Sequence, residues 1–502
     1  MQAVVFAVCG CKSSGHVEVN DGVITVTGDL STVRMLYEEE SYTFSFEANR
    51  KWHIEVDGED LDVWPLSGKK GNVEVMVSAP LPEEPLSSPV ELGTVTIAID
   101  DSDVREIVQI VRLPELKRGE KSMLAYFFGR SLRYYLTQNL RDMKSAVDDF
   151  ALSGNSLVVF WQESDSSASI REIYIDETSR ELCEVTLESV DLPSDRLTAE
   201  MLGDNLRRMM EYAPAERYSV IFLGHSTAWL PEVNSPTQTY GLKSDSGFSL
   251  SLPLDEMITR TIGEDNVLLD ISELAEGLQA TDTVFDCLYF DVCFMASLEA
   301  VYELRDMASY VIASPCEIMG DGSPYKKQLR AIFEGDYRTV CDAYLDFYSD
   351  YFYKSGCLSV IDCSKLEALA GVVKRINSAP VNEDFDASAV QVYDGRDGRF
   401  FNRYAGHWFY DVEDYYSQFC ADETLVSELR ELLSECVTYS VHTPLFYSDY
   451  NLSFNAIERY CGITLTPDER CIPTMDEESY DRLMLEFLNP ALRETSWYKA
   501  TH

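Results

Sequence analysis

Two reactive side chains each follow a hydrophobic segment that we predict to be a buried strand. Residues 218–223 (YSVIFL) lead through Gly224 into His225, and residues 284–292 (VFDCLYFDV) lead into Cys293. Near-continuous apolar runs separated by helical patterns are typical of parallel strands that are buried on both faces. Open parallel sheets place their chemistry just beyond the carboxyl ends of the strands. His225 and Cys293 are therefore candidates to meet at one edge of a sheet.

A cysteine and a histidine that meet in this way could hydrolyse amide bonds. The thiolate is the nucleophile, and a free thiol with a pKa of about 8.5 is mostly protonated at neutral pH. A nearby histidine can take that proton and later deliver it to the leaving amine. Taken alone, a cysteine at the end of a buried strand is more often a structural residue. The residues around Cys293 and His225 therefore decide between the two interpretations.

Short motifs surround both residues. Residues 291–295 read Asp-Val-Cys-Phe-Met, and a glutamate-rich helical pattern follows them. The first motif keeps His225 and Trp229, with Ser226 and Ala228 between them. These motifs resemble the clostripain-type cysteine peptidases of the caspase-like clan, in which one strand leads to His-Gly-x-Gly-Trp and a second leads to Asp-x-Cys-x-Met. Ser226 and Ala228 stand where that family usually has glycines.

The resemblance implies a role for each matched residue. Cys293 would be the nucleophile and His225 the general acid and base. The backbone N–H groups of Cys293 and Ser226 would form the oxyanion hole. Asp291 lies on the same strand face as Cys293 and would help form a pocket for Arg or Lys, although capping of the following helix or orientation of the loop is the alternative role. Because glycine permits backbone conformations that serine disfavours, we expect Ser226 to weaken the hole.

Other residues near the predicted site have less specific signals. Family members are often cleaved in the loop after the histidine strand, and Lys243 is a basic residue in that loop, so we expect self-cleavage there. His407 and His442 could replace His225 as partners of the nucleophile. Neither follows a buried strand of the expected kind, so we interpret both as structural residues.

The charge of the chain limits its partners. The 502 residues include 41 Lys and Arg against 86 Asp and Glu, for a formal net charge of −45. The sequence has no basic stripe of the kind that nucleic-acid binding requires, so we expect no nucleic-acid partner. The predicted chemistry requires no cofactor, and we predict no metal ligands. Calcium could bind the acidic loops at Asp245, Asp321 and residues 411–414, but no EF-hand spacing is present and a solvated acidic surface is the simpler interpretation.

The N-terminal residues 1–16 combine a short apolar run with a cysteine and a polar stretch. This pattern resembles the end of a bacterial lipoprotein signal with Cys11 as the lipidated residue. No positively charged segment precedes the run, so either translation begins upstream or the resemblance is accidental. We expect an exported protein of the bacterial cell envelope or surface, in contact with the membrane only through a lipid anchor, because the sequence has no apolar run long enough to cross a bilayer.

Residues 17–113 change to short alternating segments with sandwich-like spacing. Their pattern resembles a BACON-type immunoglobulin-like domain, for which glycan contact is one expected role. A bare spacer is the role that we favour, and we interpret Trp52 and Trp64 as core residues. The alternating segments are residues 23–26, 42–46, 52–56, 73–77, 94–99 and 106–111.

From residue 119 onward the pattern predicts an α/β fold. About six strands alternate with helices, and this rhythm favours a mostly parallel sheet with helices on both faces, as in the caspase-like three-layer sandwich. Residues 171–175 and 183–187 suggest an inserted hairpin. We assign residues 119–380 to the catalytic core and 381–502 to the C-terminal part of the peptidase domain.

We therefore expect a cysteine endopeptidase that cleaves protein or peptide substrates after Arg or Lys, and that acts as a monomer. The alternative function is a catalytically weak or inactive surface lipoprotein, in which the peptidase fold serves only for binding. The intact Cys293, His225 and Asp291 favour the peptidase, whereas Ser226 and Ala228 favour the alternative.

Overall fold

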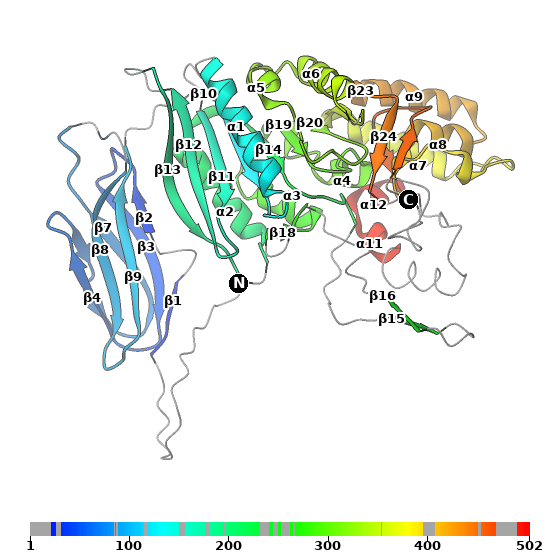
Figure 1. Cartoon of the computed structure of the whole chain (residues 1–502). Coiled ribbons are helices and arrows are strands. Elements are labelled where there is room, and N and C mark those ends of the chain that lie inside the picture. The colour runs from blue at the N-terminus through cyan, green and yellow to red at the C-terminus, as the bar shows by residue number, and fades with distance from the viewer. Residues whose placement is uncertain are drawn as a thin grey trace. The chain divides into compact units, whose positions relative to one another are not determined.

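The structure is a computed structural model of the whole chain (Figure 1). The chain divides into two compact units, Met1–Lys117 and Arg118–His502, which we call the N-terminal unit and the α/β unit and describe separately. The structure describes residues 22–26, 32–84, 86, 89–114, 119–149, 156–175, 180–194, 196–230, 240–243, 249–252, 262–264, 267–352, 354–394, 407–449, 453–467 and 489–502.

The N-terminal unit is all β and consists of two sheets. Apolar side chains alternate along its strands, as expected for sheets with one buried face. One sheet contains, in spatial order, β1 (Ile24–Val26), β3 (Ser41–Ala48), β7 (Gly71–Ser78) and β5 (Asp62–Trp64). The other contains β2 (Thr32–Met35), β9 (Arg105–Arg112), β8 (Val90–Ile99), β4 (Trp52–Asp57) and β6 (Ser67–Gly68).

The two tryptophans of this unit have different environments. Trp52 is buried, packs edge-on against Phe46 and donates a hydrogen bond from its indole N–H to the Lys69 carbonyl at 3.0 Å. Its assignment to the core is confirmed. Trp64 is 69% exposed, so its assignment to the core is wrong. It lies on β5, an edge strand, beside Met76 on the outer face of the sheet.

The α/β unit is built on a nine-stranded sheet, counted over the described residues. Its spatial order is β13 (Leu182–Asp191), β12 (Ser167–Ile175), β11 (Ser156–Gln162), β10 (Gly119–Phe127), β14 (Ala215–Leu223), β19 (Phe285–Asp291), β20 (Ala308–Ala313), β21 (Cys357–Asp362) and β23 (Val437–His442).

This sheet is larger and more mixed than the predicted one. Its five central strands, β11 to β20, pair in parallel, but two antiparallel strands extend it at each edge. A connection of a few residues joins β11 to β12, and such a short connection permits only antiparallel pairing. The predicted hairpin corresponds to β12 and β13, which pair in antiparallel as part of the main sheet. β23 lies beyond residue 380, so the sheet also uses residues from the segment that we assign to the C-terminal part; the boundary at 380 stays a prediction.

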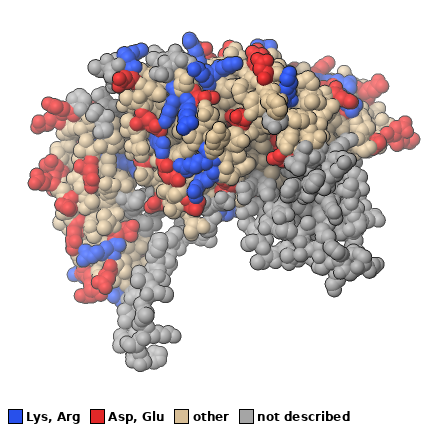
Figure 2. Space-filling view, in the orientation of Figure 1, with Lys and Arg blue, Asp and Glu red and all other residues tan. Residues whose placement is uncertain are grey.

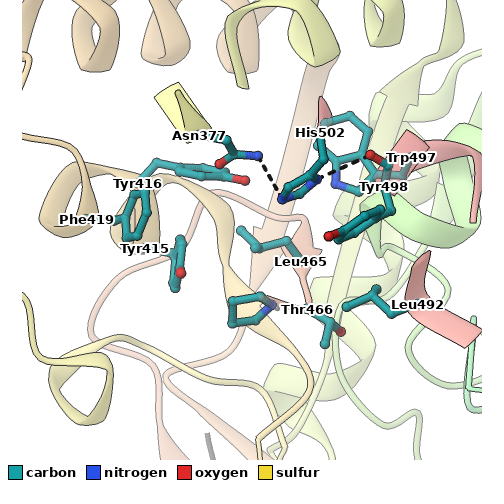
Figure 3. Close-up of a pocket in the computed structure, with 11 residues that line it drawn as sticks. Asn377, Tyr415, Tyr416, Phe419, Leu465, Thr466, Leu492, Trp497, Tyr498 and His502 are labelled. Carbon is teal, nitrogen blue, oxygen red and sulfur yellow. Dashed lines mark hydrogen bonds between the residues drawn. The ribbon is translucent and has the colours of Figure 1, made fainter. Parts of the chain in front are cut away.

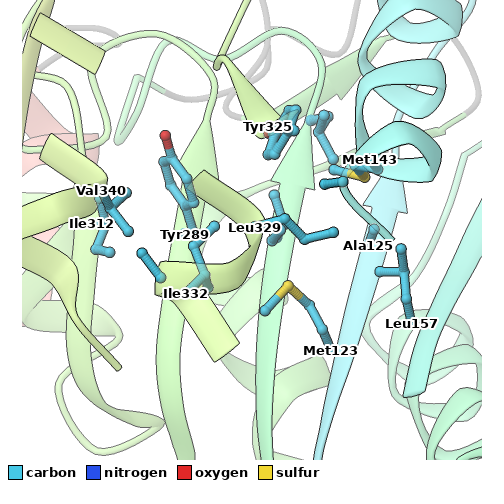
Figure 4. Packing of buried hydrophobic residues seen from close by; sticks show 14 of the residues in the cluster. Met123, Ala125, Met143, Leu157, Tyr289, Ile312, Tyr325, Leu329, Ile332 and Val340 are labelled. Atoms are coloured by element: carbon cyan, nitrogen blue, oxygen red, sulfur yellow. The ribbon is translucent and has the colours of Figure 1, made fainter. Parts of the chain in front are cut away.

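Helices cover both faces of the large sheet (Figure 1). On one face α1, α5 and α6 form a core with inward residues of the strands, such as Met123, Ala125 and Tyr289 (Figure 4). The neighbouring Tyr126 points to the opposite face, where its hydroxyl accepts a hydrogen bond from Asn205 of α2 at 3.1 Å. Because successive strand residues face opposite sides, this contact places α2 on the other face. The result is a three-layer arrangement, as the sequence predicts.

The remaining elements have the following bounds. The helices are α1 (Arg133–Asp149), α2 (Ala199–Tyr212), α3 (Ile271–Gln279), α4 (Leu298–Glu303), α5 (Tyr325–Glu334), α6 (Tyr337–Asp350), α7 (Leu366–Asn377), α8 (Val412–Phe419), α9 (Glu423–Cys436), α11 (Asn489–Glu494), α12 (Ser496–Thr501) and the short 3₁₀ helices η2 (Cys363–Lys365) and η3 (Ala387–Ala389). The small hairpins pair β15 (Tyr240–Lys243) with β16 (Ser249–Leu252), β17 (Ile262–Glu264) with β18 (Val267–Leu269), β22 (Tyr410–Asp411) with β26 (Thr464–Leu465), and β24 (Leu445–Ser448) with β25 (Ser453–Ala456).

The surface of each unit carries many acidic side chains. On the face that Figure 2 presents, Asp and Glu are spread over both units and are interspersed with Lys and Arg. Within the described ranges, no helix is both long and apolar enough to cross a membrane.

Helix α4, which begins shortly after Cys293, carries a buried glutamate. The Oε1 atom of Glu299 accepts a hydrogen bond from the Thr466 backbone N–H at 2.7 Å, while its buried Oε2 atom has no hydrogen-bond partner within the described ranges. Burial raises the pKa of Glu299 to about 8. The folded protein therefore favours the protonated form of this carboxyl group.

We predict that Glu299 makes folding stability fall as the pH rises. Because its pKa is higher in the folded state than the ordinary 4.5, the folded state binds the proton more tightly, and stability is lost as the pH increases from about 4.5 to about 8. The contribution of one such group reaches about 1.4 kcal/mol per pH unit. Glu299→Gln should flatten the pH dependence of the free energy of unfolding, measured by urea denaturation. An unchanged slope would contradict the prediction.

Candidate active site

The register of three parallel strands brings the predicted catalytic residues to one edge of the large sheet. Leu223, at the end of β14, pairs with Phe127 of β10 on one side and with Asp291 of β19 on the other. His225 and Cys293 are each two residues beyond this row. They therefore follow neighbouring strands at the same carboxyl edge, as the sequence predicts.

The thiol of Cys293 is half-buried and interacts with the backbone of the loop that follows β20. Its sulfur accepts a hydrogen bond from the Ile318 N–H at 3.3 Å and lies 4.0 Å from the Ile318 carbonyl oxygen. Burial, and then the negative charge of Glu317, raises the pKa of the thiol. The resting thiol therefore keeps its proton until a base removes it.

Glu317 is itself an unusual carboxyl group. It accepts hydrogen bonds from the Ser448 hydroxyl at 2.7 Å and from the Asp449 N–H at 2.9 Å. Burial raises its pKa to about 7, so its charge changes near neutral pH. Because the charged form opposes formation of the Cys293 thiolate, the state of Glu317 modulates the nucleophile.

The imidazole of His225 is held by two residues that the sequence analysis does not identify. Its Nε2 atom lies 2.9 Å from the Ser131 hydroxyl and 3.8 Å from Oε2 of Glu264, and its side chain is 40% exposed. Within the described residues both hydrogen bonds of the thiol are to Ile318, so the thiol and the imidazole are not hydrogen-bonded to each other here. Catalytic hydrogen bonds often form only when substrate binds.

In the turn after His225, Ala228 stands where the resemblance predicts a glycine, and its backbone is strained. Ala228 has a φ of 56°, in the left-handed region that disfavours residues with a Cβ atom. Ser226 is described by the structure and does not have a positive φ. Its hydroxyl accepts a hydrogen bond from the Ala228 N–H at 2.9 Å. The strain therefore lies at Ala228, and Ser226 supports the turn.

The residue after the nucleophile also has a left-handed backbone. Phe294 has a φ of 62°, its N–H donates to the Cys316 carbonyl at 3.1 Å, and its ring stacks on Phe409 at 4.2 Å. These contacts fix the turn that carries Cys293. A fixed backbone at the nucleophile is what an oxyanion hole made from main-chain N–H groups requires.

Asp291 is buried beneath the nucleophile. Its Oδ2 atom accepts hydrogen bonds from the Ser323 N–H at 3.0 Å and the Tyr325 hydroxyl at 2.7 Å, whereas its buried Oδ1 atom has no hydrogen-bond partner in the described part of the chain. Burial raises the pKa of Asp291. The N-cap of α4 is Ser297, so the alternative role of Asp291 as a cap of the following helix is wrong. Its hydrogen bonds to Ser323 and Tyr325 agree with the other alternative, orientation of the loop.

The acidic residues considered for calcium have partners in the protein. The Asp321 carboxylate accepts a hydrogen bond from Tyr351, Asp411 caps α8, and Asp414 pairs with Arg459 at 3.0 Å. Asp245 lies outside the described residues. The described part of the chain holds no group of three or more ligand side chains suited to a metal.

The other predicted positions are placed as follows. The backbone of Lys243 ends β15, opposite Ser249 of β16, and Cys11 lies outside the described residues. His407 is buried and contacts Asp394 at 3.0 Å, while Nδ1 of His442 lies 2.9 Å from the Thr443 carbonyl. Both histidines thus have local partners, in keeping with structural roles.

A cavity of about 240 Å³ lies elsewhere in the α/β unit, beside the C-terminal helix α12 (Figure 3). Its walls include Tyr416, Trp497 and Tyr498, and the Tyr498 ring stacks on His502 at 3.9 Å. None of the residues predicted for catalysis lines this cavity.

We predict that Glu317→Gln makes Cys293 more reactive towards iodoacetamide. Removal of the carboxylate removes a charge that raises the thiol pKa, and a shift of about one unit would speed alkylation about threefold to tenfold above pH 7. Below about pH 6 Glu317 is protonated in the parent, so the two rates should converge. Peptide mass spectrometry would follow Cys293 alone. Glu334→Gln, on the exposed surface of α5, is the control, and equal rates at high pH would refute the prediction.

Comparisons with known proteins agree with this architecture. The family model described as "Clostripain family" matches residues 126–448. A secreted C11 cysteine protease from Bacteroides thetaiotaomicron, iotapain, is 28% identical over 77% of this chain and 99% of its own, with a TM-score of 0.63. No curated protein matches the chain.

Two further solved structures share the fold at lower identity. A secreted C11 protease from Bacteroides thetaiotaomicron, in complex with an irreversible peptide inhibitor, is 20% identical over 76% of this chain and 99% of its own, with a TM-score of 0.59. An inactive zymogen C11 protease from Parabacteroides distasonis is 23% identical over 77% of this chain and 99% of its own, with a TM-score of 0.58. The family match spans well over half of the sequence, and the mixed α/β sheet is consistent with a caspase-like fold. The chain belongs to the clostripain family and is a cysteine peptidase.

Proposed function

We propose that this protein is an endopeptidase that cleaves peptide bonds after Arg or Lys, with Cys293 as nucleophile and His225 as its acid and base. The observation that carries the proposal is the register of β14 with β19, in which Leu223 pairs with Asp291. This pairing brings the two reactive residues to the same edge of the sheet. The exposed imidazole and the half-buried position of Cys293 support access of a peptide to this edge.

The proposed reaction proceeds in two steps. The imidazole takes the thiol proton, and the thiolate attacks the carbonyl carbon to give a tetrahedral oxyanion, which main-chain N–H groups at Cys293 and Ser226 stabilise. The C–N bond breaks as the imidazolium gives its proton to the leaving amine, which leaves a thioester. Water then loses a proton to the imidazole and attacks the thioester, and the peptide acid and the thiol are released.

The buried carboxylate of Asp291 supports a preference for basic side chains. One of its oxygens has two donors, but the buried Oδ1 has no hydrogen-bond partner among the residues that the structure describes. A buried acceptor without a partner is costly, and a substrate guanidinium or ammonium group would supply the missing donor together with an opposite charge. The same cation would favour the ionised form of Asp291, whose pKa burial raises.

Export to the cell envelope fits this activity. The 28% identical relative is described as secreted, and the N-terminal pattern around Cys11 suggests a lipid anchor. For the N-terminal unit, a spacer and a glycan-binding module remain the two proposals. The indole of Trp64 is exposed, so substitution of Trp64 would test whether this unit stacks on a sugar ring. Calcium binding also stays a proposal.

Turnover tests the central proposal. Purified parent protein should hydrolyse short reporter peptides that end in Arg or Lys, whereas Cys293→Ala and His225→Ala should each lose at least about 10³-fold in kcat. The same preparations, analysed by intact-mass spectrometry, show whether the parent alone is cut after Lys243. A folded parent that turns over no peptide, even after treatment with trypsin, would instead support the binding-protein alternative.

Asp291→Asn tests the preference for basic residues. The variant keeps the shape of the side chain but removes its charge, so kcat/KM for Arg and Lys reporters should fall about 10²-fold relative to a citrulline reporter of nearly equal shape. Asp350→Asn, at the exposed end of α6, is the matched control and should leave the ratio unchanged. An equal loss on charged and neutral reporters would show that Asp291 supports the fold of the site and does not select the substrate.

A further inference from the structure

The contacts of His225 define the proton positions of a small network. The Ser131 hydroxyl donates its single proton to Oε2 of Glu264 and also lies 2.9 Å from Nε2 of His225. A hydroxyl group has one proton to donate, so the bond to the imidazole must use the oxygen as acceptor. Nε2 therefore carries the proton. In a neutral imidazole the other nitrogen, Nδ1, is then the one able to accept a proton.

The carboxylate of Glu264 is buried and held in place by hydrogen bonds. Its side chain is 1% exposed, and its carboxylate accepts hydrogen bonds from the backbone N–H groups of Arg130 and Ser131 as well as from the Ser131 hydroxyl. A buried carboxylate is tolerated when its acceptors are satisfied in this way. All of these donors come from the turn between β10 and α1.

The main chain also joins the histidine turn to the segment that carries Glu264. The Gly263 N–H donates to the His225 carbonyl at 2.9 Å, and Ser226 forms an antiparallel bridge with Ile262. Strand β17 thus binds the backbone of the histidine turn, and its last residue, Glu264, reaches the imidazole. The placement of Glu264 relative to the ring follows from backbone structure and does not depend on a flexible side chain alone.

We propose that Glu264 and Ser131 are positioning residues of the peptidase: they hold His225 through Nε2 in the tautomer whose Nδ1 atom accepts the proton of Cys293. The proposal rests on the dyad of the proposed function. When the imidazole becomes positively charged, the Glu264 carboxylate at 3.8 Å stabilises that charge. Neither residue touches the substrate or the sulfur in this scheme. Both act through the histidine.

Four variants test the proposal by kinetics. Ser131→Ala removes the hydroxyl from an exposed position, and Ser131→Thr restores a hydroxyl. Glu264→Gln removes the charge, and its amide N–H groups could reverse the direction of the Ser131 hydrogen bond. Ser131→Ala and Glu264→Gln should lower kcat at least about tenfold with little change in KM, and Ser131→Thr should retain most of the activity. Glu276→Gln, an exposed charge loss on α3, should behave as the parent.

Histidine NMR tests the same contact without turnover. In ¹⁵N-labelled full-length protein, with the His225 signals assigned by a His225→Gln variant, the parent should show the Nε2–H tautomer. Ser131→Ala should lose this preference, and Glu264→Gln should lower the imidazole pKa by about one unit, because a nearby negative charge favours imidazolium. The acid limb of the kcat/KM profile should move to lower pH by the same amount.

The outcomes separate this proposal from the proposed function. Variants that match the parent in kcat and in His225 titration would overturn the positioning role while leaving the peptidase intact. Faster turnover in Ser131→Ala would also overturn it, because the contact would then restrain the imidazole from its task. If the parent turns over no peptide, the proposed function fails. The tautomer and titration of His225 in the variants would then still show whether Ser131 and Glu264 hold the imidazole. If Glu264→Gln does not fold, Ser131→Ala at the exposed position gives the answer.

Discussion

The parallel pairing of β14 with β19 is the constraint on which the site depends. Backbone hydrogen bonds fix Leu223 opposite Asp291, and two residues later each chain presents its reactive side chain. β10 continues the same row through Phe127, so the turn that carries Ser131 emerges at this edge as well. A slip of one residue would turn every side chain of a strand to the opposite face, and burial of both faces of the sheet prevents it.

The centre of the fold could be predicted from the sequence, but its edges could not. Strands such as β14 and β19 are continuous apolar runs, because helices cover both of their faces. β13 and β23, at the two edges, are only partly buried and have mixed patterns, so periodicity does not show that they join the main sheet. Short connections force the antiparallel pairing of β12 with its neighbours, which a count of alternating strands and helices does not capture, whereas β23 follows β21 only after a long helical segment and its direction has no such signal.

Some residues of the site could likewise be predicted from the sequence, and others could not. Cys293, His225 and Asp291 were within reach of sequence reasoning because a short motif or a strand end marks each one. Ser131 and Glu264 belong to different segments, far from His225 in the sequence, and their link to it is a hydrogen-bond network that only the folded chain creates. One available signal was that Ser131 lies shortly after an apolar run, residues 123–128, which includes the end of β10. Glu264 is the last residue of a strand of three residues and has no comparable signal.

Gly129 shows how a residue without a functional group can belong to such a site. It has a φ of 81°, and a Cβ atom built there would overlap the carboxyl group of Glu264. Any side chain at this position would displace the Glu264 carboxyl group from its hydrogen bonds with Ser131. Gly129 has no side chain that could take part in catalysis. Because it lacks a Cβ atom, however, it leaves room for the Glu264 carboxylate in the network around the imidazole.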